Sequence, residues 1–231
     1  MSVRSSTSSE VPAWLQEGLE EIKPRLRGWL HAATVPLAFV AFMLVLVVAE
    51  RMVVRAGVAV FMVSALALFT CSALYHTRTW AAGPYAWWRR IDHAMIYLLI
   101  AGSSTPYCLL LLDRGEAVAV LALVWGSALL GMLFRLLWID APRWLYVSLY
   151  VLVGCSALAS WEGLVAGAPP ATTTLLVLGG AFYVLGALVY GFRRPDPWPR
   201  WFGYHEVFHA LTILAFACHY AGVGVLAQQR A

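Results

Sequence analysis

GWLHAATVPLAFVAFMLVLVV, residues 28–48, contains no Asp, Glu, Lys or Arg and is long enough to cross a ~30 Å bilayer core as a helix. Six further apolar runs of similar length follow it. The predicted spans lie near residues 28–48, 56–76, 92–112, 117–138, 144–164, 172–192 and 202–226. Each run is apolar on every face instead of alternating, which indicates helices rather than barrel strands. The sequence therefore predicts an all-α, polytopic membrane protein with a bundle of seven transmembrane helices.

The composition excludes a soluble domain. Hydrophobic residues make up 61% of the 231-residue chain and charged residues only 12%, against about 25% charged in a typical soluble protein. Too few polar residues remain to cover a surface in water. The formal net charge of +4 is small, and Arg and Lys do not cluster along one face, so no nucleic acid is expected as a partner. The expected partners are membrane lipids.

The polar N-terminal segment, residues 1–27, precedes a transmembrane domain expected over residues 28–228. Apolar side chains recur at roughly helical spacing among acidic ones between residues 14 and 22, which predicts a helix lying in the membrane interface. No short apolar core followed by a cleavage site is present, so the segment is not expected to be a signal peptide.

The distribution of basic residues predicts the orientation of the bundle. With a cytoplasmic N-terminus, the inside carries Arg4, Lys23, Arg25, Arg27, Arg78, Arg89, Arg90, Arg143, Arg193, Arg194 and Arg200. The outside carries Arg51, Arg55, Arg114 and Arg230. Because cytoplasmic loops are enriched in Lys and Arg, we expect the N-terminus to be cytoplasmic and the C-terminus to be outside.

Several polar residues occupy the spans, where ionisable side chains are costly and mark candidate functional sites. Ser72 and His76 lie four residues apart at the end of the second span, and so share a helix face. His205 and His209 repeat this spacing at the start of the seventh span, and Asp92 opens the third. On the predicted topology, all of these residues lie at the cytoplasmic ends of their helices.

This grouping predicts a metal site. Three histidines with a water as the fourth ligand are typical of catalytic zinc, which acidifies that water. His76, His205 and His209 are the predicted ligands of one Zn²⁺, although the same donors also suit other transition metals. Asp92 is expected to orient or deprotonate the water. Ser72 is expected to hydrogen-bond to the water or to a substrate.

Other polar residues in the spans favour structural roles. His219 follows His209 by ten residues, ~15 Å along a helix, and is expected to make an interhelical hydrogen bond. His31 and His93 are expected at the interface or beside the ligands. Arg135, near the inner end of its span, is expected to extend toward the head groups.

The segment His-Glu-Val-Phe-His at residues 205–209 also matches HExxH, the metalloprotease helix in which the Glu is the general base. Its position at a membrane interface is unusual for a soluble zinc protease, but an intramembrane protease would use the same motif. His76 would serve as third ligand in either scheme, so the protease alternative stays open on spacing alone.

Four segments carry a family resemblance: RGWLHAA (27–33), SALYH (72–76), IDHAMIYLLIAGSSTP (91–106) and FGYHEVFH (202–209). They resemble the hemolysin III group of the progestin and adipoQ receptor (PAQR) family, in the family's order and over residues 24–226. The resemblance implies seven helices, a cytoplasmic N-terminus and, for this group, a bacterial plasma membrane.

The resemblance also implies zinc bound by His76, His205 and His209, with Asp92 and Ser72 at the open position. Adiponectin receptors, which are also PAQR proteins, tolerate other residues where this chain has Glu206, which disfavours the protease because a general base could not vary. The leading expectation is a zinc-dependent, ceramidase-like hydrolase of a lipid amide or ester at the cytoplasmic side. A regulator of membrane lipid homeostasis with structural zinc is the alternative. A pore-forming cytolysin ranks lowest, because the polar residues gather at one membrane face.

Overall fold

The computed structural model describes residues 24–229, and every secondary-structure element within that range is a helix. The elements are α2 (Trp29–Val48), α3 (Met52–Thr77), α4 (Ala82–Leu111), α5 (Arg114–Leu137), α6 (Arg143–Cys155), the 3-10 helix η1 (Ser156–Ser160), α7 (Trp161–Ala166), α8 (Pro170–Phe192) and α9 (Tyr204–Gln229). The interfacial helix predicted between residues 14 and 22 lies outside the described residues.

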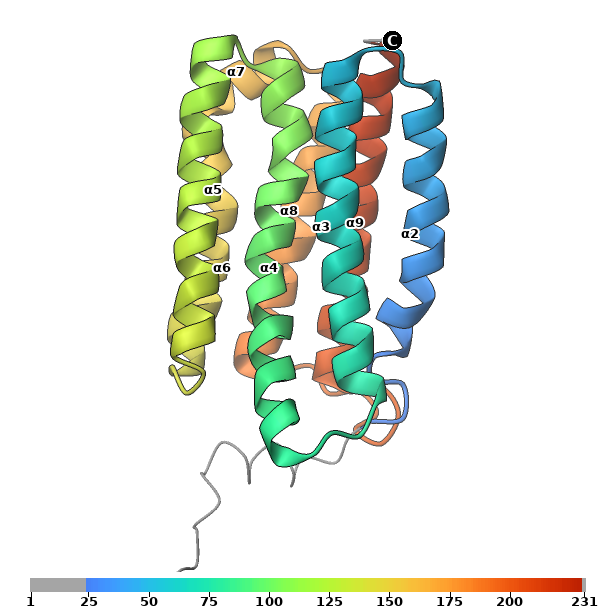
Figure 1. Cartoon of the computed structure of the whole chain (residues 1–231), viewed down its shortest axis with the longest axis vertical. Coiled ribbons are helices and arrows are strands. Elements are labelled where there is room, and N and C mark those ends of the chain that lie inside the picture. The colour runs from blue at the N-terminus through green and yellow to red at the C-terminus, as the bar shows by residue number, and fades with distance from the viewer. Residues whose placement is uncertain (1–23, 230–231) are drawn as a thin grey trace, which may run out of the picture.

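Seven segments of the described chain are long and apolar enough to cross a membrane. Six are single helices, and the fifth in order is the composite Arg143–Ala166, in which α6, η1 and α7 follow one another. The segments run alongside one another as a bundle (Figure 1). Even the shortest, the 20-residue α2, extends ~30 Å at ~1.5 Å per residue. The prediction of an all-α protein with seven membrane-spanning helices is confirmed.

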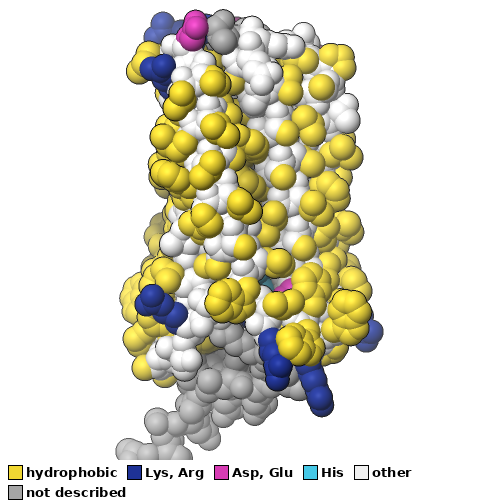
Figure 2. All heavy atoms as spheres, turned by 90° about the vertical axis from the view of Figure 1, so that its right-hand side faces the viewer, with side chains coloured by type: hydrophobic (Ala, Val, Ile, Leu, Met, Phe, Trp, Pro, Cys, Tyr) yellow, Lys and Arg dark blue, Asp and Glu magenta, His cyan; other side chains and the backbone are white. Residues whose placement is uncertain are grey.

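The outer surface of the bundle is apolar between two charged ends. Large side chains project outward along the helices, and Leu37, Val47 and Leu130 are each at least 70% exposed. On the face shown in Figure 2, hydrophobic side chains cover the middle of the molecule and Arg side chains lie near its two ends. A surface this apolar fits the hydrocarbon of a bilayer rather than water.

The helix ends follow local signals. Asp113 precedes α5, and its side chain accepts a hydrogen bond from the Glu116 backbone N–H at 2.9 Å, as an N-cap does. α4 begins at Ala82, ten residues before the predicted start of the third span. An apolar run predicts the part of a helix that lies in the membrane, and the helix itself can begin earlier. Here the Trp- and Arg-rich residues before Asp92 form the first turns of α4. Asp92 therefore lies well inside α4 instead of opening it.

Aromatic rings fill the seam between α2, α3 and α9. Phe42 of α2 meets Phe61 of α3 edge to face, with ring centroids 5.1 Å apart. Phe216 of α9 meets Phe69 of α3 in the same way, also at 5.1 Å. Edge-to-face pairs are favourable beyond the area they bury. This seam fixes α3 against α9, the two helices that carry the predicted metal ligands.

The chain before α2 is joined to the loop before α9. The backbone N–H groups of Arg25 and Leu26 donate to the carbonyls of Arg200 and Trp201, at 3.1 and 3.3 Å. Gly28 then turns the chain into α2 with φ 85°, in the left-handed region that favours glycine. These contacts place residues 25–28 beside the first turn of α9.

Candidate metal centre

The i, i+4 spacing on two helices brings three histidines together. His76 comes from the last turns of α3, and His205 and His209 from the first turns of α9. All three are buried, and one ligand atom from each lies within 4.8 Å of the others. The Nε2 atoms of His76 and His205 are 3.3 Å apart. The described residues therefore contain a buried group of three histidines that could hold a metal ion.

The donor set fits a transition metal. Two nitrogens bound tetrahedrally at ~2.0 Å from one zinc ion are ~3.3 Å apart, which matches the separation of His76 and His205 Nε2. The ligand atom of His209 lies within 4.8 Å of those of the other two histidines. Its Nδ1 is buried and has no hydrogen-bond partner among residues 24–229. Neutral imidazole nitrogens in such a group are typical ligands of zinc and related metals.

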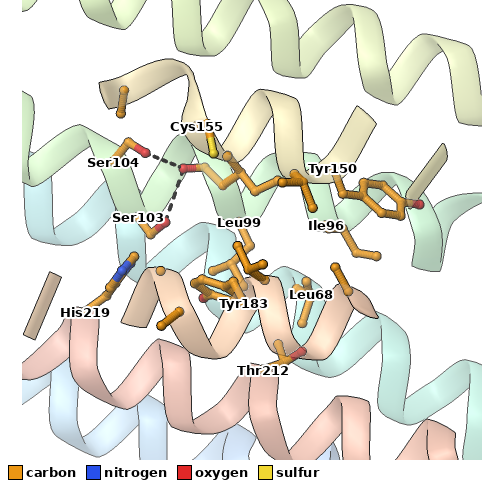
Figure 3. Close-up of a pocket in the computed structure, with 18 of the residues that line it drawn as sticks. Leu68, Ile96, Leu99, Ser103, Ser104, Tyr150, Cys155, Tyr183, Thr212 and His219 are labelled. Atoms are coloured by element: carbon orange, nitrogen blue, oxygen red, sulfur yellow. Dashed lines mark hydrogen bonds between the residues drawn. The ribbon is translucent and has the colours of Figure 1, made fainter. Parts of the chain in front are cut away.

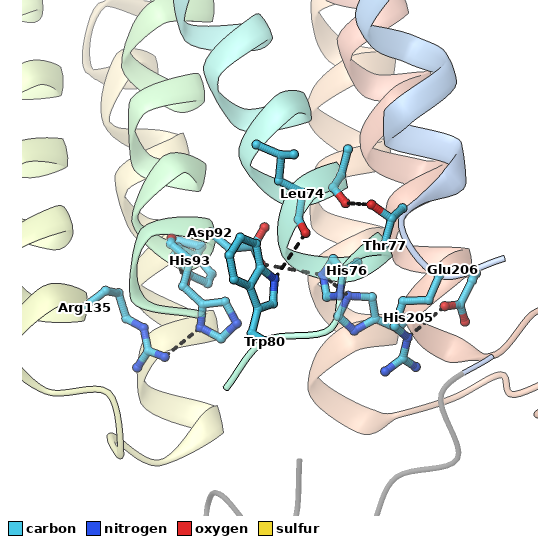
Figure 4. A network of polar contacts seen from close by, with 12 residues as sticks. Leu74, His76, Thr77, Trp80, Asp92, His93, Arg135, His205 and Glu206 are labelled. Atoms are coloured by element: carbon cyan, nitrogen blue, oxygen red, sulfur yellow. Dashed lines mark hydrogen bonds and ion pairs between the residues drawn. The ribbon is translucent and has the colours of Figure 1, made fainter. Parts of the chain in front are cut away.

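Asp92 of α4 and Ser72 of α3 lie beside the histidines, as predicted from their positions. Asp92 Oδ2 is 3.7 Å from His76 Nε2, and Ser72 and Asp92 line the same cavity as His205 and His209. Figure 4 shows Asp92 near His76 and His205 on neighbouring helices. The structure thus brings all five predicted site residues into one group.

Glu206 does not face the histidines' metal-binding atoms, although it follows His205 in the HExxH pattern. Its side chain is fully buried and pairs with Arg27 Nε at 2.9 Å. Its other oxygen accepts a hydrogen bond from the Gly203 N–H at 2.8 Å. The ion pair appears in Figure 4 on the side of His205 away from Asp92. One carboxylate oxygen thus joins α9 to Arg27 before α2, and the other binds Gly203 directly before α9. Because both oxygens are engaged, a role for Glu206 as a general base is disfavoured.

His31 lies closer to the site than an interfacial residue would. Its ring, 2% exposed, stacks on His209 with centroids 3.9 Å apart and planes 18° apart, and meets Phe69 edge to face at 5.0 Å. Neither ring nitrogen has a hydrogen-bond partner among the described residues. The sequence placed His31 near the cytoplasmic end of the first span, but its contact with α9 depends on how α2 packs.

Arg135 corrects an expectation. It was expected to extend toward the head groups, but it is fully buried. Its Nη2 lies 2.7 Å from Nδ1 of His93, and its guanidinium stacks over the Tyr146 ring at 4.3 Å. The neighbouring helices α4 and α6 supply these partners. Their contacts offset the free-energy cost of burying the charged guanidinium, so the side chain stays inside the bundle. His93 accordingly faces Arg135 rather than the three histidines, as Figure 4 shows.

A cavity of about 550 Å³ extends from the histidine cluster along α9. His205, His209, Thr212 and His219 all line it, so it follows the helix for roughly 20 Å. Asp92 and Ser72 line the same end as His205 and His209, whereas the middle is lined by apolar side chains, among them Leu68, Ile96 and Leu99 (Figure 3). Its volume lies within the ~300–1,000 Å³ of ordinary ligand pockets.

The fold and site define the class: a multi-pass integral membrane protein with a buried three-histidine cluster at one end of an apolar cavity. A family model described as "Haemolysin-III related" matches residues 19–220, and the chain belongs to that family. The resemblance to the hemolysin III group is thereby confirmed.

Similar proteins come from bacteria and animals. The "Hemolysin-3 homolog" of Bacillus subtilis (strain 168) is 30% identical over 154 residues, which cover 67% of this chain and 69% of that protein. The "Hemolysin-3" of Bacillus cereus is 29% identical over 100 residues, 43% of this chain and 46% of its own. The "Adiponectin receptor protein" of Drosophila melanogaster is 30% identical over 162 residues, 61% of this chain and 35% of its own. The chain thus spans less than half the length of the last two. The adiponectin receptor match supports the wider PAQR relationship, and the Bacillus relatives agree with the expected bacterial plasma membrane.

Proposed function

We propose that this protein is a zinc-dependent hydrolase of lipid amides or esters. The proposal rests on the position of the buried histidine cluster, two members of which, His205 and His209, line one end of a long, largely apolar cavity. A lipid whose chain occupies the cavity would bring its polar carbonyl beside the histidines. Apolar pockets with a few convergent polar groups at one end are typical of lipid sites.

His76, His205 and His209 would hold the zinc ion. When bound there, zinc supplies Lewis-acid polarisation of a carbonyl and makes water acidic enough to lose a proton near neutral pH. The aromatic seam between α3 and α9 keeps the two ligand-bearing helices in fixed positions.

Asp92 would move the proton. Its carboxylate accepts a proton from the attacking water and passes it to the nitrogen or oxygen that leaves the carbonyl carbon. The Ser72 hydroxyl, which lines the cavity with Asp92, would hydrogen-bond to the attacking water or to the substrate. Both side chains line the cavity, so a bound carbonyl group can reach them.

The substrate would enter from the bilayer. Its chain lies among apolar side chains of α3, α4 and α8, while its head group stays with the polar residues at the histidine end. On the predicted orientation this end is cytoplasmic. Lipids are therefore the proposed partners.

The test compares lipid turnover and metal content of the purified protein and of Asp92→Asn. Ceramides and lysophospholipids serve as substrates, with products measured by mass spectrometry. We expect Asp92→Asn to keep its metal and to lose at least about 100-fold in turnover, the usual contribution of a general base. Asp140→Asn, an exposed carboxylate between α5 and α6, is the matched control and should retain full turnover.

One observation supports a second candidate, a lipid-responsive regulator. The histidine cluster links α3 to α9, so a structural ion there would couple their packing to occupancy of the cavity. Absence of turnover in the wild-type protein, with metal bound, would favour this candidate over the hydrolase. The apolar middle of the cavity gives no support to a conducting pore.

A further inference from the structure

The end of the cavity far from the histidine cluster carries polar side chains that the proposed chemistry does not use. Ser103 and Ser104 of α4, Tyr183 of α8 and His219 of α9 line this end, and are called here the distal polar group. Figure 3 shows Ser103, Ser104 and His219 together at one end of the cavity, with Leu99 and Tyr183 next along it.

Two buried atoms of the distal polar group have no hydrogen-bond partner among residues 24–229. They are Nδ1 of His219 and the hydroxyl of Tyr183. The two rings meet edge to face with centroids 5.4 Å apart, so both atoms belong to the same small region. Buried polar atoms are nearly always paired, because leaving one unpaired is costly. A ligand group at this end of the cavity would supply the missing partner.

The distal polar group has a defined pattern of donors and acceptors. His219 Nε2 donates to the Leu176 carbonyl at 3.4 Å, which leaves Nδ1 as the acceptor of a neutral ring. The hydroxyls of Ser103 and Ser104 both donate to the Ile100 carbonyl, at 3.2 and 2.8 Å. Their oxygens therefore remain available as acceptors.

A hydroxyl group matches this pattern best. The unpaired Tyr183 hydroxyl can donate to a ligand oxygen, while His219 Nδ1 can accept from a ligand O–H. A carboxylate only accepts, and would leave His219 Nδ1 unpaired. A plain hydrocarbon chain would leave both atoms unpaired.

The His219 ring of α9 packs against Gly179 of α8. A Cβ at Gly179 would overlap ring atoms of His219, so only glycine lets the ring lie against the helix. The backbone carbonyl of His219 accepts a hydrogen bond from the Tyr107 hydroxyl at 2.8 Å, which fixes α9 against α4 at this level. The unpaired nitrogen is thus held in place before any ligand binds.

The spacing of the two polar ends limits the ligand. His219 follows His209 by ten residues of α9, ~15 Å along the helix axis. An extended hydrocarbon chain advances roughly 1.25 Å for each C–C bond of ~1.5 Å, so about twelve carbons span this distance.

We infer that the distal polar group binds a hydroxyl carried roughly twelve carbons from the head group of an acyl lipid whose head lies at the histidine cluster. The inference rests on the proposed function and deepens it, because it names the lipid class as one with a mid-chain hydroxyl. Tyr183 and His219 recognise the hydroxyl and the cavity between them and Asp92 holds the intervening chain.

The test measures binding of stearate, 12-hydroxystearate and 2-hydroxystearate to the purified, metal-loaded protein in detergent, by competition with radiolabelled stearate. We expect 12-hydroxystearate to bind roughly fivefold to tenfold more tightly than stearate, the effect of one or two additional hydrogen bonds. The 2-hydroxy isomer, whose hydroxyl lies beside the head group, should show no such advantage.

Tyr183→Phe should abolish the preference for 12-hydroxystearate and leave the affinity for stearate unchanged. Thr212→Val is the matched control, because Thr212 lines the same cavity but its hydroxyl is already bonded to the Phe208 carbonyl at 3.0 Å. Equal affinities for all three acids would overturn this inference and leave the proposed function standing. Failure of all three acids to bind would overturn both, because the cavity would then not accept a lipid chain.

Discussion

The Glu206→Gln substitution separates the structural role of this carboxylate from the catalytic role that the HExxH pattern predicts. In the structure, Glu206 is fully buried and pairs with Arg27, whose side chain is 10% exposed. The amide of Gln can still accept the hydrogen bond from the Gly203 N–H, so the substitution removes mainly the charge. Metal binding and lipid turnover should persist, because the carboxylate does not face the histidine nitrogens.

The expected loss of stability follows from the burial of the pair. Removing one partner of a buried ion pair typically costs about 3–5 kcal/mol. Because Arg27 keeps some exposure at the membrane interface, we expect the lower end, about 3 kcal/mol. For a chain of this length, that corresponds to a fall in Tm of roughly 10 °C.

The assay combines thermal unfolding in detergent with metal analysis and turnover for the wild type, Glu206→Gln, Arg27→Gln and the double variant. Each single variant should lose stability, and the double variant should lose less than the sum, because the two side chains contact each other directly. Unchanged stability together with lost turnover in Glu206→Gln would contradict a structural role for Glu206 and would favour its role as a general base.

Three more predictions address the ligands, the turn into α2 and the orientation. His76→Ala should lose bound metal, whereas His219→Ala should retain it; equal metal content in the two, measured by mass spectrometry, would argue against the cluster. Gly28→Ala should lower the free energy of unfolding by about 1–2 kcal/mol from its positive φ alone. It should also weaken metal binding, because the new Cβ would lie 2.7 Å from His76 Cβ; a fully stable variant in a denaturant titration would contradict this. In a cysteine-free background, an impermeant maleimide applied to intact cells should label Asp113→Cys and not Asp140→Cys, and the reverse pattern would invert the predicted topology.

The seven spans and the grouping of the candidate site residues could be predicted because both depend on local patterns. Uninterrupted apolar runs define membrane helices through their length alone. His205 and His209 share a face because the helix repeats every ~3.6 residues, whatever the rest of the chain does. His76 and Asp92 could be added because the positive-inside rule placed the ends of their predicted spans on the same side of the membrane.

The roles of Glu206, His31 and Arg135 could not be predicted in the same way. Glu206 carries the right spacing for a protease motif, but its orientation is decided by Arg27, which is 179 positions away in the chain. His31 contacts His209 only because α2 packs against α9. Arg135 is buried rather than extended to the interface because Tyr146 and His93 surround it. Each outcome depends on tertiary neighbours that periodicity does not reveal.

Zinc K-edge X-ray absorption on the purified protein would show whether His76, His205 and His209 hold one zinc ion. We expect about one zinc per chain in a four-coordinate shell at ~2.0 Å with three imidazole ligands. Loss of this signal in His205→Ala, with the fold retained, would support the assignment. A folded wild-type protein without metal, or an unchanged spectrum in His205→Ala, would contradict it.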